Sequence, residues 1–187
     1  MYIGLKLNCG GVGMGLLDKF MGLVGDTISG LAGGQSGGDT EGTAGGKKEE
    51  IRNIFNSKVK DGESYKVLAG SYMVTTKKLT KEVRTYYNYI VGYKDGDDPE
   101  IVIISTTYDL ASVEEPVLCK KSECKKAAYL QKTGSFSISH PKLGDAPLEF
   151  AVIASAAWGR SGALIIPVSY VDEFTPFTDF FQNRFAK

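Results

Sequence analysis

The chain of 187 residues has little of what many enzymes and secreted proteins depend on. It contains one histidine and three cysteines, so it provides neither a multi-histidine metal site nor an even set of disulfide partners. An odd number of cysteines leaves at least one thiol free, which fits a reducing compartment. The number of lysines and arginines equals the number of aspartates and glutamates, at 22 each, so the chain has no net positive charge that would attract nucleic acid. We therefore expect no metal, no cofactor and no nucleic-acid partner.

Long apolar runs are also missing. The longest largely apolar run, residues 150–158, has about half of the roughly 20 residues that a membrane-spanning helix needs. The N-terminal sequence MYIGLKLNCGGVG lacks the apolar core of a secretory signal. These absences predict a cytoplasmic protein, with association at a membrane surface left open.

Glycine, in contrast, is abundant and unevenly distributed. Of the 23 glycines, 15 lie before residue 47, and the β-branched and aromatic runs of a packed domain follow that point. We expect a Gly-rich N-terminal segment over residues 1–46 and a β-rich globular domain over residues 47–187. Within the first part, the sequence predicts an amphipathic helix over 15–31 and a flexible linker over 32–46. Met14 begins the sequence MGLLDKF and is a second candidate for the start of the chain.

The amphipathic segment 15–31 is the leading candidate for a partner-binding element. Its apolar residues recur at steps of three and four, and the glycines among them each cost a helix about 1 kcal/mol relative to alanine. The isolated helix would be mostly unfolded in water, so it needs a surface to fold against. That surface is a protein partner, neighbouring copies of the chain or a membrane, or else the segment is a weakly ordered tail. The candidate contact residues are Leu17, Phe20, Met21, Val24 and Ile28.

The second part of the chain has the pattern of a mainly β (α+β) fold. Apolar residues at helical spacing near Ile51 and Phe55 predict a short helix, which the turn signal Asp61-Gly62 closes. A C-terminal helix is predicted over 174–185, with Thr175 as its cap, Pro176 in its first turn and four phenylalanines on one face. Turn residues separate eight candidate strands, at 65–76, 84–93, 100–107, 116–119, 125–132, 135–139, 148–156 and 163–170. The sequence therefore predicts an antiparallel β-barrel or sandwich of about eight strands with a C-terminal helix.

The clearest candidates for reactive chemistry are the two cysteines of CKKSEC, Cys119 and Cys124. Neighbouring lysines would lower the pKa of a nearby thiol and favour redox or disulfide chemistry. Free thiols in a basic hairpin are the favoured interpretation, and half of a zinc site is another. His140 lies in SISHPKLGDAP, and we expect it at the surface of a turn. No residue is predicted to be catalytic.

Three further groups of residues are candidates for binding. The lysines around the two cysteines form the best anion-binding candidate, although lysines that protect a strand edge explain them equally well. In WGRSGA, Trp158 and Arg160 are residue types enriched at binding hot spots. Strand alternation places Tyr87, Tyr89 and Tyr93 on one face, either at a core edge or at a contact surface. The four lysines are Lys120, Lys121, Lys125 and Lys126.

Taken together, the sequence favours a non-enzymatic binding or assembly module. Its tethered N-terminal segment would dock on a protein partner or on neighbouring copies in a homo-oligomer. The alternatives are a peripheral membrane or lipid-binding protein that uses the same helix as a reversible anchor, and a thiol-dependent enzyme.

Overall fold

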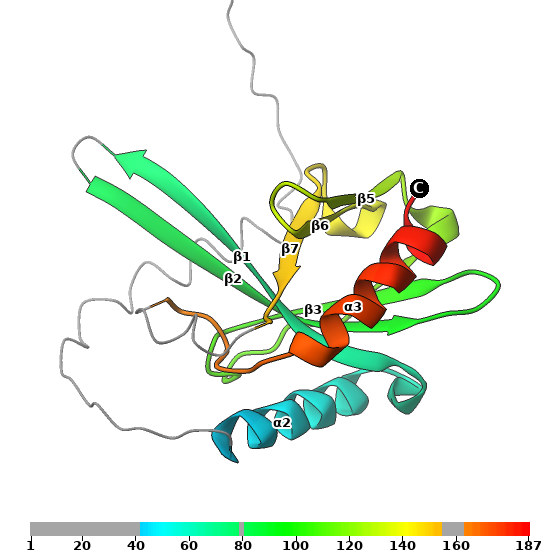
Figure 1. Ribbon diagram of the computed structural model, residues 1–187, viewed down its shortest axis with the longest axis horizontal. Coiled ribbons are helices and arrows are strands. Elements are labelled where there is room, and N and C mark those ends of the chain that lie inside the picture. The colour runs from blue at the N-terminus through cyan, green and yellow to red at the C-terminus, as the bar shows by residue number, and fades with distance from the viewer. Residues whose placement is uncertain (1–41, 79–80, 155–162) are drawn as a thin grey trace, which may run out of the picture. The chain divides into compact units, whose positions relative to one another are not determined.

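The β-rich part of the chain forms one antiparallel sheet. The computed structural model describes residues 42–78, 81–154 and 163–187, and within them seven strands pair in the order β4-β3-β2-β1-β7-β6-β5. The sheet curls into a half-barrel with β4 and β5 at its open edges (Figure 1). This confirms the expected antiparallel, barrel-like fold with a C-terminal helix. The strands are β1 (Lys66–Lys78), β2 (Lys81–Lys94), β3 (Glu100–Thr106), β4 (Val117–Lys120), β5 (Lys126–Leu130), β6 (Ser135–Ser139) and β7 (Leu148–Val152).

The central strands divide their side chains between two faces, because successive residues of a strand point to opposite sides. In β2, Tyr89 and Tyr93 point to one side, which we call the tyrosine face, and both are only 5% exposed. Ile90 and Gly92 point to the other side, which we call the glycine face. Each face is covered by a different helix.

Helix α2 (Gly42–Lys58) packs on the glycine face through Ile51 and Phe55, which are fully buried. A Cβ atom built on Gly92 would lie 2.1 Å from Cζ of Phe55, so the phenyl ring occupies the space that a side chain would need. The helix begins earlier than Lys47, where the sequence pattern starts. It ends before Asp61, whose left-handed φ of 55° belongs to the expected Asp-Gly turn.

The tyrosine face is covered by α3 (Val171–Phe180) and the π-helical turn η5 (Phe181–Phe185). The Phe177 ring lies 5.0 Å from that of Tyr93 and 4.7 Å from that of Phe136, measured between centroids. The expected cap at Thr175 is wrong, because the helix begins at Val171 and contains Pro176. Acidic residues in the first turn, Asp172 and Glu173, favour this earlier start because they stabilise a helix N-terminus.

The eighth expected strand, over 163–170, is also wrong. This segment lies across the glycine face without joining the sheet. The Asn88 amide holds it, because its Nδ2 donates to the Leu164 carbonyl at 2.9 Å and its Oδ1 accepts from the Ile166 amide at 3.2 Å. Pro167 has no N–H for a strand ladder. The apolar run that suggested a strand therefore covers the core instead.

Candidate functional site

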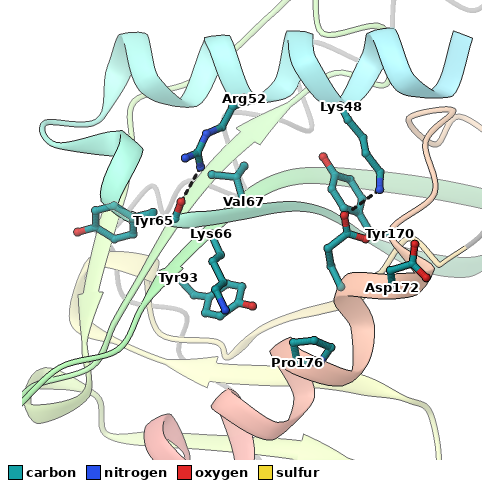
Figure 2. A pocket seen from close by; sticks show the side chains of 10 residues that line it. Lys48, Arg52, Tyr65, Lys66, Val67, Tyr93, Tyr170, Asp172 and Pro176 are labelled. Atoms are coloured by element: carbon teal, nitrogen blue, oxygen red, sulfur yellow. Dashed lines mark hydrogen bonds and ion pairs between the residues drawn. The ribbon is translucent and has the colours of Figure 1, made fainter. Parts of the chain in front are cut away.

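A groove opens where β7 separates from β1. Strand β7 pairs with β1 only at Gly70 and Ser71, so the first residues of β1 have an open edge. The helices α2 and α3 cover opposite faces of the sheet and flank this edge (Figure 2). The groove between them has a volume of about 510 Å³. Its lining residues are Lys48, Arg52, Tyr65, Lys66, Val67, Tyr93, Tyr170, Asp172, Glu173 and Pro176.

The backbone of β1 contributes hydrogen-bonding groups to this groove. In an antiparallel strand, both backbone groups of a residue point to the same side, and the side alternates along the strand. The Ala69 carbonyl accepts from Ile153 N at 3.0 Å, and the Tyr65 carbonyl accepts from Arg52 Nη1 at 2.5 Å. Val67 lies between them, so its N–H and C=O point the same way, away from β2. Within the described residues neither group has a hydrogen-bond partner, although unpaired backbone groups seek one.

The α2 wall of the groove is basic because Lys48 and Arg52 are one helical turn apart and share a face. Arg52 is held in place, since it also donates from Nη2 to the Glu63 carbonyl at 3.1 Å. Lys48 Nζ lies 2.8 Å from Glu173 Oε1 and 4.7 Å from the Tyr170 ring centroid. This ion pair connects the α2 wall to the α3 wall.

The α3 wall is acidic. Asp172 and Glu173 occupy the first turn of the helix. The second carboxylate oxygen of Glu173, Oε2, is buried and has no hydrogen-bond partner within the described part of the chain. Asp172, in contrast, is exposed and forms no ion pair within the described residues.

Three tyrosines complete the lining and remain protonated at neutral pH. Burial, followed by the Glu173 charge, raises the pKa of Tyr93 and of Tyr170. Burial, followed by the hydrogen bond to Glu100, raises the pKa of Tyr65. The rings thus provide apolar surface and hydroxyl groups rather than negative charge.

The cysteines do not form the reactive site that their lysine neighbours suggested. Both Cys119 and Cys124 are buried and unpaired, as favoured from the sequence. Burial raises the pKa of the Cys119 thiol to about 12 and that of the Cys124 thiol to about 11. The predicted lowering by the four neighbouring lysines does not occur, because burial is the largest cause of both shifts and the lysines that oppose it are Lys142 for Cys119 and Lys187 for Cys124. Within the described residues, no group of three or more histidine, cysteine or acidic side chains is placed to hold a metal ion.

His140 is not at the surface of a turn, as the sequence suggested, but 2% exposed. Its Nδ1 accepts from the Lys142 amide at 3.2 Å, capping the turn η3 (Pro141–Leu143). Its Nε2 lies 3.3 Å from Glu123 Oε2. The ring is buried because it satisfies the backbone of this turn, which makes its role structural.

The four candidate anion-binding lysines have different surroundings. Lys120 Nζ lies 3.7 Å from Glu100 Oε1, and Lys121 Nζ donates to the Arg184 carbonyl at 2.6 Å. Lys125 and Lys126 are exposed. Two of the four ammonium groups are thus already engaged, and anion binding stays a prediction for this cluster.

The candidate partner-binding residues lie outside the described residues. This holds for Leu17, Phe20, Met21, Val24 and Ile28 in the N-terminal segment, and for Trp158 and Arg160. Their roles stay predictions.

Of the groove residues, sequence reasoning had singled out only Tyr93 as a possible contact residue. The one further signal in the sequence is the spacing of Lys48 and Arg52, which places two cations on one helix face. Nothing local indicates that this face would meet the start of α3, because the contact joins residues 125 positions apart.

Comparisons with protein-family models, curated proteins and solved structures found no match to this chain. Among the described helices, none combines the length and the apolar character needed to cross a bilayer. The function is therefore inferred from the geometry and chemistry of the site.

Proposed function

We propose that this chain is a non-enzymatic binding module that takes an extended peptide segment of a protein partner along the open edge of β1. The observation that supports this best is the unpartnered backbone of Val67. An added strand would satisfy its N–H and C=O, as in proteins that bind peptides by extending a sheet. The groove leaves room for the side chains of such a segment beside the strand.

The uncommitted charges of the groove, Lys66 and Asp172, favour a peptide with one acidic and one basic side chain. Arg52 is committed to two carbonyls and Lys48 to Glu173. The Lys66 side chain is exposed and, within the described residues, its ammonium group has neither a hydrogen bond nor an ion pair; its Nζ lies 6.0 Å from the Tyr93 ring centroid. A carboxylate on the bound segment would pair with Lys66. The exposed carboxylate of Asp172 would pair with a basic side chain of the same segment.

The lining of the groove has no cysteine, histidine or serine, so it lacks the residues of a thiol-dependent or serine-dependent catalytic site. The two described thiols are buried elsewhere and protonated, which gives no support to a thiol-dependent enzyme. The proposal keeps the N-terminal segment as a second contact element, docking on the same partner or on another copy of the chain.

The proposal is tested by selecting random peptides of about ten residues, the upper range of natural strand length, on the full-length chain. Val67→Pro removes the outward N–H without removing a bond to β2, and proline is tolerated at such edge positions. Val67→Thr retains both the N–H and the branched shape, and is the matched control. We expect selected peptides to bind the wild type and Val67→Thr equally, and Val67→Pro about tenfold more weakly, a difference of about 1.4 kcal/mol.

NMR provides a second measurement that does not depend on how well the proline variant folds. In the wild-type chain, a selected peptide should shift the amide resonances of Lys66 and Val67 and slow hydrogen exchange at Val67. Failure to select any peptide, or equal binding to Val67→Pro, would contradict the proposed function.

A further inference from the structure

The hairpin of β1 and β2 extends beyond the rest of the sheet. Strand β7 pairs no further along β1 than Ser71, and β3 pairs no further along β2 than Asn88. Residues 73–78 and 81–86 therefore form a two-stranded projection, which we call the arm (Figure 1). Among the described residues, neither side of the arm has another strand beside it.

The arm has exposed apolar side chains and no residue of the types that usually interrupt strand pairing. Met73, Val74 and Val83 are 48%, 36% and 45% exposed, respectively. Its two described strands contain neither proline nor glycine, the residues that most often interrupt strand pairing. An open edge of this kind is a template for pairing with another strand.

The residues whose backbone faces the open edge of β2 follow from the register. Val67 and Ala69 point away from β2, so the even-numbered residues of β1 point toward it. Their partners in β2 carry odd numbers, as in the pair Val74 and Thr85. The backbones of Glu82 and Arg84 therefore point outward, to the open edge.

We propose that two copies of this chain pair through the β2 edges of their arms, antiparallel, about a two-fold axis that passes beside Val83. In this register Glu82 lies opposite Arg84 of the second copy, and Arg84 lies opposite Glu82 of the second copy. Both are hydrogen-bonded pairs, so their backbone groups satisfy one another. The two Val83 residues form a non-hydrogen-bonded pair, in which side chains lie closest, with Cα atoms about 4.5 Å apart.

Charge complementarity makes the second copy the fitting occupant. Within one chain Arg84 Nη2 lies 3.6 Å from Glu82 Oε2, and both side chains are about half exposed, at 58% and 49%. In the paired arms each Glu82 lies between its own Lys77, its partner across β1 and β2, and the second copy's Arg84. Opposite charges directly across a sheet stabilise pairing.

The edge of β1 is a poorer surface for self-pairing. Residues 73–78 include Lys77 and Lys78 and no acidic residue. Pairing of two such edges would place no acidic side chain of one copy opposite these lysines of the other, so no ion pair would form between the copies. The charge pattern therefore selects β2 over β1.

Charge exchange in the full-length chain tests the proposal. The wild type should show a concentration-dependent mass that approaches twice 20.2 kDa in sedimentation equilibrium. Glu82→Arg should place arginine opposite arginine and Arg84→Glu should place glutamate opposite glutamate, so each variant alone should remain monomeric. The double variant Glu82→Arg/Arg84→Glu should recover the wild-type dimer.

Mixing the two single variants gives the sharpest result. One chain then has arginine at both positions and the other has glutamate at both, so the mixture should form 1:1 heterodimers although neither chain pairs with itself. A wild type that stays monomeric would overturn the proposal. A dimer that is unaffected by the single variants, or single variants that do not associate when mixed, would do the same. Arm amides protected from hydrogen exchange in a monomer would show that another segment covers the edge.

Discussion

Replacing Gly92 by alanine should create a steric clash that either separates α2 from the sheet or strains the packing between them. An alanine Cβ would lie 2.1 Å from Cζ and 2.4 Å from Cε2 of Phe55. Because the Phe55 ring is fully buried, it has no open space into which it can rotate. Overpacking of this kind costs about 1–3 kcal/mol, and complete loss of the ring's packing would cost about 3–5 kcal/mol. The lower conformational entropy of alanine in the unfolded chain returns only about 0.5–1 kcal/mol.

We therefore expect Gly92→Ala to lower the free energy of unfolding by about 2–4 kcal/mol. Urea unfolding followed by far-UV circular dichroism measures it. Gly96→Ala is the matched control, because a Cβ at Gly96 meets no atom within 4 Å, and it should change stability by less than about 0.5 kcal/mol.

A double-mutant cycle assigns the loss to the ring contact. In a Phe55→Leu background, Gly92→Ala should cost less than about 1 kcal/mol, because the smaller side chain leaves room for the methyl group. Wild-type stability for Gly92→Ala, or an equal cost in both backgrounds, would refute the contact between Phe55 and Gly92 as the reason for the glycine.

Four other predictions concern three separate parts of the chain. Phe177→Ala should lower the free energy of unfolding by about 3–5 kcal/mol in the same urea assay, because the ring is fully buried between the sheet and α3; a loss below about 1 kcal/mol would contradict that packing. At most one of the three thiols should react with an aromatic disulfide reagent before unfolding, since Cys119 and Cys124 are buried. The pKa values of these two thiols are raised in the folded state from 9.0 to about 12 and about 11. The thiols of the unfolded chain therefore ionise first, and the free energy of unfolding should fall as the pH rises above about 9. A free energy of unfolding that stays constant at alkaline pH, and that Cys119→Ala leaves unchanged, would contradict this. If the N-terminal segment docks on protein, wild-type chain should not float with phosphatidylserine vesicles, whereas flotation that Phe20→Asp/Met21→Asp abolishes would make the segment a membrane anchor.

The sequence pattern predicted elements whose apolar residues follow a clear period. The four phenylalanines of the C-terminal helix are an example, because burial on one face fixes their spacing. Strand β3 was indicated instead by a continuous run of β-branched residues, because both of its faces are buried. The same logic failed for residues 163–170, where an apolar run covers the core without joining the sheet. An apolar pattern indicates that a segment is buried, but it does not predict whether the segment joins a sheet. Here the position of the segment depends on the side-chain amide of Asn88, which is distant in sequence.

The candidate site could not be predicted from the sequence because it consists of a groove and an unpaired strand edge, which depend on where neighbouring elements end. The unpaired edge of β1 exists because β7 diverges after Gly70, and no residue type encodes that divergence locally. The arm was missed for a different reason. Residues 77–83 are mostly charged, so they gave no strand pattern, yet pairing between β1 and β2 continues through them to Lys78 and Lys81.

The β1–β2 hairpin is one continuous ribbon that has the groove near its base and the arm at its tip. From Val67 to Thr76, which lies opposite Val83, a strand rise of about 3.3 Å per residue gives roughly 30 Å. Two chains joined through their arms would therefore hold their two proposed peptide sites at a fixed separation of roughly 60 Å. Such a dimer would bind most tightly to a target that carries two copies of the bound sequence at a matching separation, because the second contact then forms at high effective concentration.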